Sequence, residues 1–322
     1  FAEQPPAWSD FCTQPYAVVC GTNTEESSLR TARIKQIEER LEKPALEATY
    51  QFLYGDGPMP ANFDKIEIQG ITPKARRVRA TKIFLTELRR QLGDYLNENG
   101  VPMDFNIPQI KQSLVIAIQN TSELSADYQS KMIESVENTK VISIAEVPQE
   151  FVENSSQDVI QLYRGCSRNM FMDNAFATTI KKQKVIMICP GEIIGSVEFA
   201  KSEGLPQNFA IGPLIMTIGH ELSHHFDFRF FPNAYLDVLQ GLDAVRSSFK
   251  DQQHLEKYMS EITADIWGIK AFAVATKHLA NHPYRTILAR GGFNDLCGAR
   301  DDGEHPNGLF RIGYLAPKYL CF

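Results

Sequence analysis

The sequence predicts a mainly helical fold with a small β-sheet, an α+β class in which helices dominate. Two long segments, 26–53 and 74–98, repeat apolar side chains at helical spacing. One run rich in β-branched residues, 184–189, is the best candidate for a strand. The 322 residues are 43% hydrophobic and 22% charged, which supplies enough apolar material for a globular core.

The expected elements follow one another with recognisable stops. They are, in order, helices over 26–53, 74–98, 107–118 and 123–137 and a strand over 184–189. The first helix stops at Gly55-Asp56-Gly57-Pro58 and the second at Asn99-Gly100, because glycine and proline break helices. The series of expected helices ends near 145–148, which predicts a boundary between an N-terminal helical region, 1–147, and a catalytic region, 148–322.

The most informative motif is His220-Glu221-x-x-His224. On a helix, His220 and His224 lie four residues apart on one face, within reach of one metal ion. Glu221 lies where a general base would meet a metal-bound water. The preceding run, 209–218, is apolar, so the helix is expected to enter the core, where a site can be held rigidly. The alternative is a pair of histidines that binds no metal.

A catalytic metal site of this type needs a third protein ligand and a position open to water. Glu261 and Asp265 are again four residues apart, so they share one helical face. One carboxylate would bind the metal, and the other would accept the free N–H of a ligating histidine. The surrounding residues are unusually apolar, and two acids in so apolar a helix need a positive partner. The alternative is a solvated acidic pair.

Together these motifs resemble the neprilysin-like zinc metallopeptidases. The matching elements are, in chain order, Cys12 and Cys20, Asn174-Ala175-Phe176, Gly219-His-Glu-x-x-His-x-Phe-Asp227, Glu261-x-x-Ala-Asp265, and His305-Pro306 followed by Phe310-Arg311. The resemblance implies a gluzincin, thermolysin-like catalytic domain with a zinc helix and a small edge-strand sheet. In such a domain an edge strand beside the zinc helix binds extended substrate by strand addition, and we expect this role for 184–189. The chain is short for this family, so the N-terminal helical region that roofs the site would be reduced.

The resemblance also implies a role for each matched residue. His220, His224 and Glu261 would be the ligands of one Zn²⁺ per chain, and Glu221 would be the general base. Asp265 would accept a hydrogen bond from a ligating histidine, and Asp227 would be a supporting polar residue nearby. The implied substrate contacts are those of His305 as stabiliser of the oxyanion, Arg311 as donor to a substrate carbonyl, and Asn174 with Ala175 as partners of the substrate backbone. Met216, one turn before His220, favours a hydrophobic substrate residue after the scissile bond. An ordinary core position for Met216 is the equally weighted alternative.

The six cysteines allow fifteen disulfide connectivities. The resemblance implies the pairs Cys12–Cys321, Cys20–Cys297 and Cys166–Cys189. Bridges between the two ends of the chain would close very long loops, for which theory expects the largest stabilisation. Two Asn-x-Ser/Thr sequons, at Asn120 and Asn154, agree with a secreted glycoprotein.

The net charge and the start of the chain bear on the expected partners and on the expected cellular location. A net charge of −6 argues against nucleic acid. The basic stretch 74–79 is read as a solvated helix face. The chain starts at Phe1 without a signal peptide or a membrane-spanning segment, so a secreted or extracellular ectodomain is expected, with no membrane anchor visible in it. The oligomeric state is open.

The sequence therefore predicts an extracellular zinc metalloendopeptidase, with Glu221 as general base and a zinc-activated water, that cleaves peptides or proteins. The runner-up is a catalytically weak or inactive metallopeptidase-like binding or regulatory protein. The third reading is an unrelated helical secreted protein whose histidines are structural.

Overall fold

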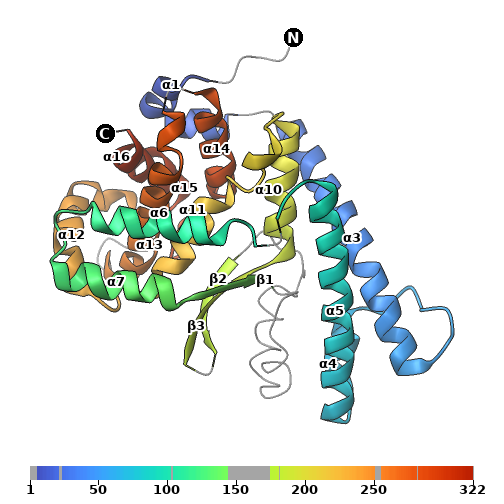
Figure 1. Cartoon of the computed structure of the whole chain (residues 1–322). Helices are drawn as coiled ribbons and strands as arrows, with labels where there is room; N and C mark the ends of the chain where they lie inside the picture. Colours follow the sequence, from blue (N-terminus) through green and yellow to red (C-terminus); the bar gives the residue numbers. More distant parts are fainter. Residues whose placement is uncertain are drawn as a thin grey trace. The chain divides into compact units, whose positions relative to one another are not determined.

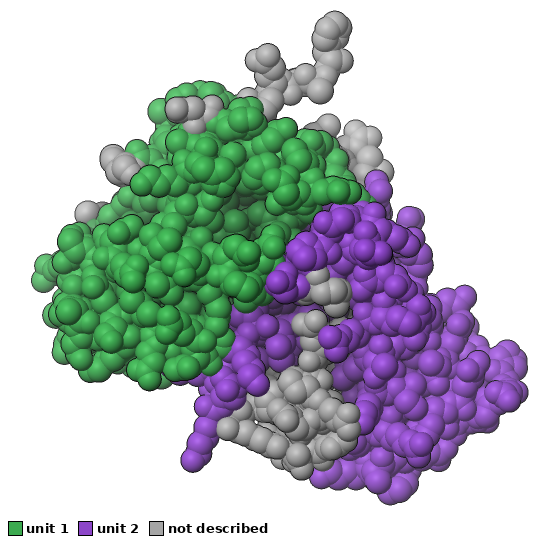
Figure 2. Space-filling model, viewed as in Figure 1, with its two compact units in different colours: residues 1–24, 106–139, 199–322 green, residues 25–105, 140–198 purple. Residues whose placement is uncertain are grey.

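The computed structural model describes residues 6–21, 24–102, 104–143, 175–180, 182–250, 255–280 and 282–321. Helices predominate, and one three-stranded sheet accompanies them in this part of the chain (Figure 1). The predicted mainly helical class with a small sheet is thus confirmed. The chain forms two compact units, distinguished by colour in Figure 2: unit 1 is 1–24, 106–139 and 199–322, and unit 2 is 25–105 and 140–198. The expected boundary at 147/148 lies outside the described residues, and each unit contains residues from both sides of it.

The regular elements among the described residues of unit 1 are all helical. Its α-helices are α1 Trp8–Thr13, α2 Pro15–Cys20, α6 Ile107–Gln119, α7 Ala126–Asn138, α11 Leu214–Ser223, α12 Leu236–Leu242, α13 Leu255–Ala275, α14 Pro283–Phe293, α15 Gly308–Phe310 and α16 Ala316–Leu320. A π-helical turn, Arg311–Leu315, joins α15 to α16, and short 3-10 turns lie at Gln207–Phe209, Pro232–Tyr235, Asp243–Ser248, Lys277–Leu279 and Asn294–Leu296. The helices expected near 107–118 and 123–137 are α6 and α7.

The centre of unit 1 is the packing of α11 against α13. Both helices are buried over most of their length, and α13 also contacts α6 and α16. Two glycines let the backbones approach: a Cβ at Gly219 would lie 3.0 Å from Cα of Gly268, and a Cβ at Gly268 would lie 2.6 Å from the Met216 carbonyl oxygen. The close approach places the His-Glu-x-x-His helix directly beside the helix that carries Glu261 and Asp265.

Two disulfides join the ends of unit 1. Cys12 is bonded to Cys321 and Cys20 to Cys297, so both of these predicted pairs are confirmed. The third predicted pair, Cys166–Cys189, includes Cys166, which lies outside the described residues. The sequence separations of the two bridges are 309 and 277 residues, so they restrict the unfolded chain over almost its whole length.

Unit 2 contains the two longest N-terminal helices and the sheet. Its elements are α3 Thr24–Tyr54, α4 Lys65–Gly70, α5 Lys74–Glu98, β1 Lys140–Ser143, β2 Ala175–Ile180 and β3 Gln183–Ile188, and α10 Pro190–Ser202 runs from unit 2 into unit 1. The helices expected over 26–53 and 74–98 are α3 and α5. The buried carboxylate of Glu198 on α10 ties them together, because Arg33 Nε contacts it at 2.6 Å and the Tyr95 hydroxyl donates to it at 2.9 Å.

The sheet corrects one expectation. The strand order is β1-β3-β2, with β3 parallel to β1 and antiparallel to β2. The segment 184–189, expected as an edge strand that adds a substrate strand, corresponds to β3, which is paired on both sides. That role for 184–189 is therefore wrong, and the edges of the described sheet are β1 and β2. Among the described helices, none combines the length and apolar character needed to cross a membrane.

We predict that Gly268→Ala destabilises the protein by about 1–3 kcal/mol, because the new methyl group pushes α11 away from α13. Gly241→Ala is the matched control. Gly241 lies in α12, where an added Cβ meets only the Lys318 Nζ, at 3.5 Å. Alanine there is expected to raise stability by about 0.5–1 kcal/mol. Urea unfolding midpoints measure both changes, and equal midpoints for the two variants would contradict the close packing.

Candidate metal centre

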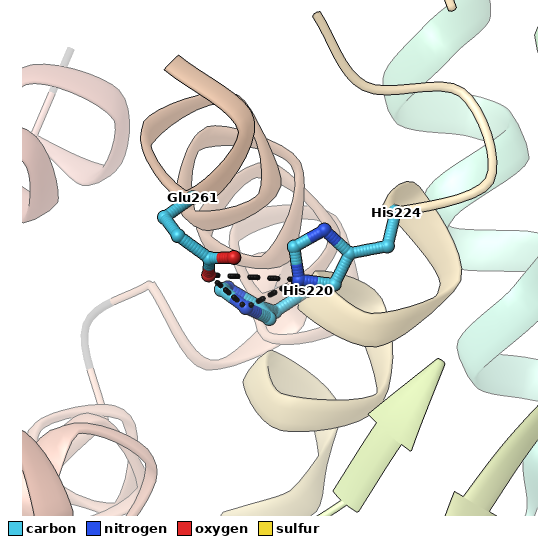
Figure 3. Close-up of side chains that lie close together, drawn as sticks. All are labelled: His220, His224 and Glu261. Carbon is cyan, nitrogen blue, oxygen red and sulfur yellow. Dashed lines mark hydrogen bonds and ion pairs between the residues drawn. The ribbon is translucent and has the colours of Figure 1, made fainter. Parts of the chain in front are cut away.

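Two packed helices bring the three predicted ligands together. His220 lies in the last turn of α11, and His224 immediately follows this helix with helical backbone angles, so the four-residue spacing still places both rings on one side. Glu261 comes from α13. Figure 3 shows the three side chains converging from these two directions. They form a group that could hold a metal ion, with one ligand atom from each residue and all three atoms within 4.8 Å of one another.

The distances within this group are short. The Nε2 atoms of His220 and His224 are 3.1 Å apart. Oε2 of Glu261 lies 3.2 Å from Nε2 of His220 and 3.5 Å from Nε2 of His224. The side chains retain only 11% exposure for each histidine and 17% for the glutamate, so little water is available to separate them.

An aspartate orients each histidine by accepting a hydrogen bond from Nδ1, the ring nitrogen that does not face the group. Nδ1 of His220 donates to Oδ1 of Asp265 at 2.9 Å, and Nδ1 of His224 donates to Oδ2 of Asp227 at 3.0 Å. An ionised carboxylate only accepts hydrogen bonds, so the proton of each neutral ring is on Nδ1. The Nε2 lone pairs therefore face the interior of the group, which is the orientation that a metal ligand needs.

Each aspartate is in turn held by an arginine. Arg311 donates to Asp265 with two parallel hydrogen bonds, each 2.6 Å long, and Nη2 of Arg229 donates to Oδ2 of Asp227 at 2.7 Å. Burial alone would raise the pKa of Asp265, but Arg311 and then His220 lower it below its usual value. Burial acts on Asp227 in the same way, and His224, Arg229 and Ser260 lower its pKa. Both aspartates are thus anionic at neutral pH.

The resulting arrangement brings three electron-pair donors close together. Two Nε2 lone pairs and a carboxylate oxygen converge within 3.5 Å, and Oε2 of Glu261 is buried without a hydrogen-bond partner in the described part of the chain. Burial lowers the pKa of His220, but contacts with Asp265 and Glu261 raise it to about 10. The site therefore attracts positive charge, which either protons or a metal ion can provide.

His305 lies next to this group and is not part of it. Its Nε2 is 3.3 Å from Oε2 of Glu261, and its Nδ1 donates to Oδ2 of Asp302 at 3.0 Å. Glu261 is the main cause that raises the pKa of His305, to about 9. Asp302 also accepts from the backbone N–H of His305 at 2.7 Å and of Glu304 at 2.9 Å. These hydrogen bonds lower the pKa of Asp302 to about 2, so an ionised carboxylate holds the ring of His305 beside the three candidate ligands.

The remaining predicted residues are placed as follows. Glu221, on α11 between the ligands, is 9% exposed and close enough to His220 to contribute to its raised pKa. Met216 is 4% exposed and packs near Gly268 and Gly292, as its core alternative requires. Ala175 is buried in β2 opposite Ile188. Asn174 lies outside the described residues.

Sequence reasoning did not find three residues that support the centre. Arg229 and Ser260 both bind Asp227, the latter through its hydroxyl at 2.6 Å, and Asp302 orients His305. Asp302 and Arg229 each lie within five residues of the histidine that they support, so a search for charged neighbours of each motif histidine could have found them. Ser260 precedes Glu261 directly and carried no signal of its own.

Comparison with known proteins gives no further guidance: no protein-family model, no curated protein and no solved structure matches this chain.

We predict that Asp227→Asn weakens metal affinity by about 10- to 100-fold, because the amide no longer attracts the Nδ1 proton of His224. Asp227 is the better test of this effect than Asp265, since Arg229 is 57% exposed and can rearrange, whereas Arg311 is buried. Competition against a chelator measures the affinity, with Asp237→Asn on the exposed face of α12 as the control. Equal affinities for both variants would show that Asp227 does not orient the ligand.

Proposed function

We propose that this protein is a zinc metalloendopeptidase with a gluzincin, thermolysin-like catalytic site. The observation that carries the proposal is the convergence of two Nε2 lone pairs and the Glu261 carboxylate, each histidine being fixed by an aspartate. Two imidazoles and one carboxylate are the ligand set of catalytic zinc in peptidases, which leaves a position open. No residue of the described chain other than these three belongs to the group.

The distances fit zinc. Zinc bonds to nitrogen and oxygen ligands are about 2.0–2.1 Å long, and in a tetrahedron such bonds separate the ligand atoms by roughly 3.3–3.4 Å. The three separations in the group are 3.1, 3.2 and 3.5 Å. A larger cation such as Ca²⁺ would need six to eight oxygen ligands, which this group does not offer. When bound, zinc supplies a Lewis acid that polarises a carbonyl and lowers the pKa of a coordinated water.

The chain's own residues account for the proton transfers. Glu221 takes a proton from the attacking water and delivers it to the leaving amine, which allows the C–N bond to break. His305 donates a hydrogen bond to the oxyanion that forms at the carbonyl carbon. Arg311 gives two of its hydrogen bonds to Asp265, so it holds the orienting carboxylate of His220. Its role as a donor to a substrate carbonyl stays a prediction.

The disulfides support an extracellular location. Bonds such as Cys12–Cys321 form and persist in oxidising compartments and are rare in the cytosol. We therefore propose that the substrates are extracellular peptides or proteins. The preference for a hydrophobic residue after the scissile bond stays a prediction, because Met216 is almost fully buried.

We predict that Glu221→Gln lowers kcat by about 10²- to 10⁴-fold, since the amide cannot accept the proton of the water. Zinc content is expected to remain one ion per chain, because all three ligands are unchanged. Peptide-library cleavage mapped by mass spectrometry, together with elemental analysis, measures both quantities. Glu134→Gln on the exposed side of α7 serves as the control and should cleave like the wild type.

The wild-type protein decides between the alternatives. Stoichiometric zinc without cleavage of any peptide would favour a metallopeptidase-like binding or regulatory protein. Absence of zinc, with neutral effects of His220→Ala and Glu261→Ala, would show that the histidines are structural.

We predict that His305→Ala lowers kcat by about 10²- to 10³-fold, the usual effect of removing one donor to an oxyanion. KM and zinc content should change little, because His305 is not one of the three ligands. His278→Ala, an exposed histidine of the same unit, is the matched control. Loss of zinc in the His305 variant would instead assign this residue to the metal.

A further inference from the structure

The two disulfides bracket the stretch of chain that carries His305 and Arg311. We call residues 297–321 the C-terminal segment. It begins at Cys297 and ends at Cys321, and the partners of these cysteines, Cys20 and Cys12, both lie in the short α1–α2 pair. The N-terminal helices are therefore covalently attached to both ends of the segment that contributes His305.

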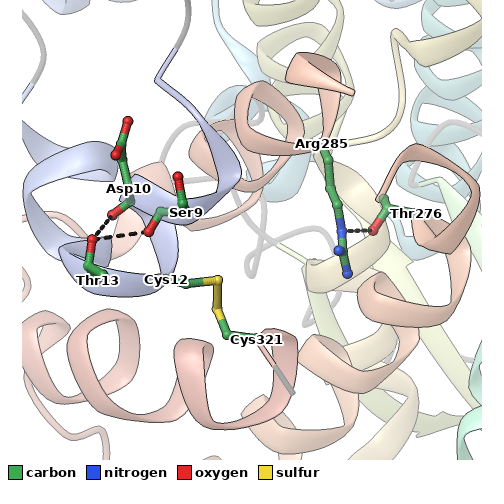
Figure 4. The surroundings of a disulfide bond; sticks show 7 residues. All are labelled: Ser9, Asp10, Cys12, Thr13, Thr276, Arg285 and Cys321. Carbon is green, nitrogen blue, oxygen red and sulfur yellow. Dashed lines mark hydrogen bonds between the residues drawn. A yellow bond between two sulfur atoms is a disulfide. The ribbon is translucent and has the colours of Figure 1, made fainter. Parts of the chain in front are cut away.

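The α1–α2 pair is itself fixed to α14. Phe11 is fully buried, with its ring 6.4 Å from that of Phe293. The guanidinium of Arg285 lies 4.1 Å from the centre of the Trp8 ring, and its Nε donates to Oγ1 of Thr276 at 3.4 Å. Figure 4 shows this arginine and the Cys12–Cys321 bridge. The pair thus offers a rigid base to which the C-terminal segment is attached.

The first part of the C-terminal segment lacks regular structure. Residues 297–307, which include His305, form no helix or strand. At the start of this loop, Cys297 is bonded to Cys20, and the next N–H, that of Gly298, donates to the Tyr16 hydroxyl at 3.3 Å. A loop without its own hydrogen-bond ladder takes its position from its attachments, so these contacts with α2 bear on where His305 lies.

The opposite side of the loop depends on a few polar contacts. Asp301 accepts from the Tyr258 hydroxyl at 3.0 Å and from the Lys250 N–H at 2.7 Å. The three metal ligands, in contrast, lie on or directly after α11 and α13, which pack against each other. The metal side of the site is therefore built on helices, and the side that carries His305 is built on a tethered loop.

We propose that Cys20 and Cys297 are positioning residues: their bridge holds the loop 297–307 so that His305 stays beside Glu261. The bridge contributes to the placement of His305 and not to the assembly of the three ligands. The expected effect of the bridge on catalysis rests on the proposed function, whereas its expected effect on the loop 297–307 does not.

Hydrogen exchange followed by mass spectrometry tests the structural consequence. In the Cys20→Ser/Cys297→Ser double variant, amides of 297–307 should exchange about tenfold faster or more, because local opening no longer breaks a covalent tie. Amides of α11 and α13 should exchange as in the wild type. The matched control, Cys12→Ser/Cys321→Ser, should leave 297–307 unchanged and accelerate exchange near α16.

Kinetics tests the catalytic consequence with the same variants. The Cys20/Cys297 variant should keep one zinc per chain and its KM, while its kcat falls by about tenfold or more, since a displaced donor loses most of its effect. The Cys12/Cys321 variant should lose less. If the wild-type protein cleaves no peptide, the proposed function fails, and the exchange measurement still decides the structural proposal.

Two results would overturn the proposal. Unchanged exchange in 297–307 would show that packing alone holds the loop. Faster exchange spread equally over α11 and α13 would show that the bridge adds only general stability. Should the double variant not fold, the same exchange is measured on wild-type protein reduced by a phosphine under native conditions.

Discussion

The carboxylate of Asp265 connects the elements on which the candidate metal centre depends. It is fully buried on α13, and it accepts hydrogen bonds from His220 on α11 and from Arg311 in the C-terminal segment. An isolated buried carboxylate would be strongly unfavourable, so the two cationic or polar partners are required for it to stay ionised. The same charge then fixes the tautomer of His220. Metal geometry, helix packing and the C-terminal segment are thus coupled through one side chain.

The two histidines are supported by the same chemistry in different environments. His220 has the buried pair of Asp265 and Arg311, whereas His224 has Asp227 with the largely exposed Arg229. Electrostatic attraction is weaker where water competes, so the second set tolerates rearrangement better than the first. The hydroxyl of Ser260 compensates in part, since it donates to Asp227 from α13. His220 is therefore oriented directly from α13, which also supplies Glu261, and His224 is oriented indirectly, because Ser260 of α13 binds Asp227.

The spacing of residues that are close together in the sequence predicted several helices and two pairs of site residues. The helices α3 and α5 follow from apolar periodicity, and the i, i+4 pairs placed His220 with His224 and Glu261 with Asp265 on common faces. Contacts between segments that are far apart in the sequence were harder to predict. The central position of β3 depends on which strands pair with it, and the division into two units interleaves segments that are far apart in the chain. Neither property is encoded in a window of neighbouring residues.

The glycines at the helix contact show how the metal centre depends on packing. Gly219 directly precedes His220, and Gly268 lies one turn after Asp265, so this close backbone approach occurs beside the candidate ligands. Any side chain there would separate α11 from α13, and it would lengthen the contact between His220 and Glu261 together with that between His220 and Asp265. The proposed zinc site requires bond lengths within about 0.2 Å of their usual values. Gly219 and Gly268 therefore bear on the geometry of the candidate metal centre, although neither glycine contributes a ligand atom.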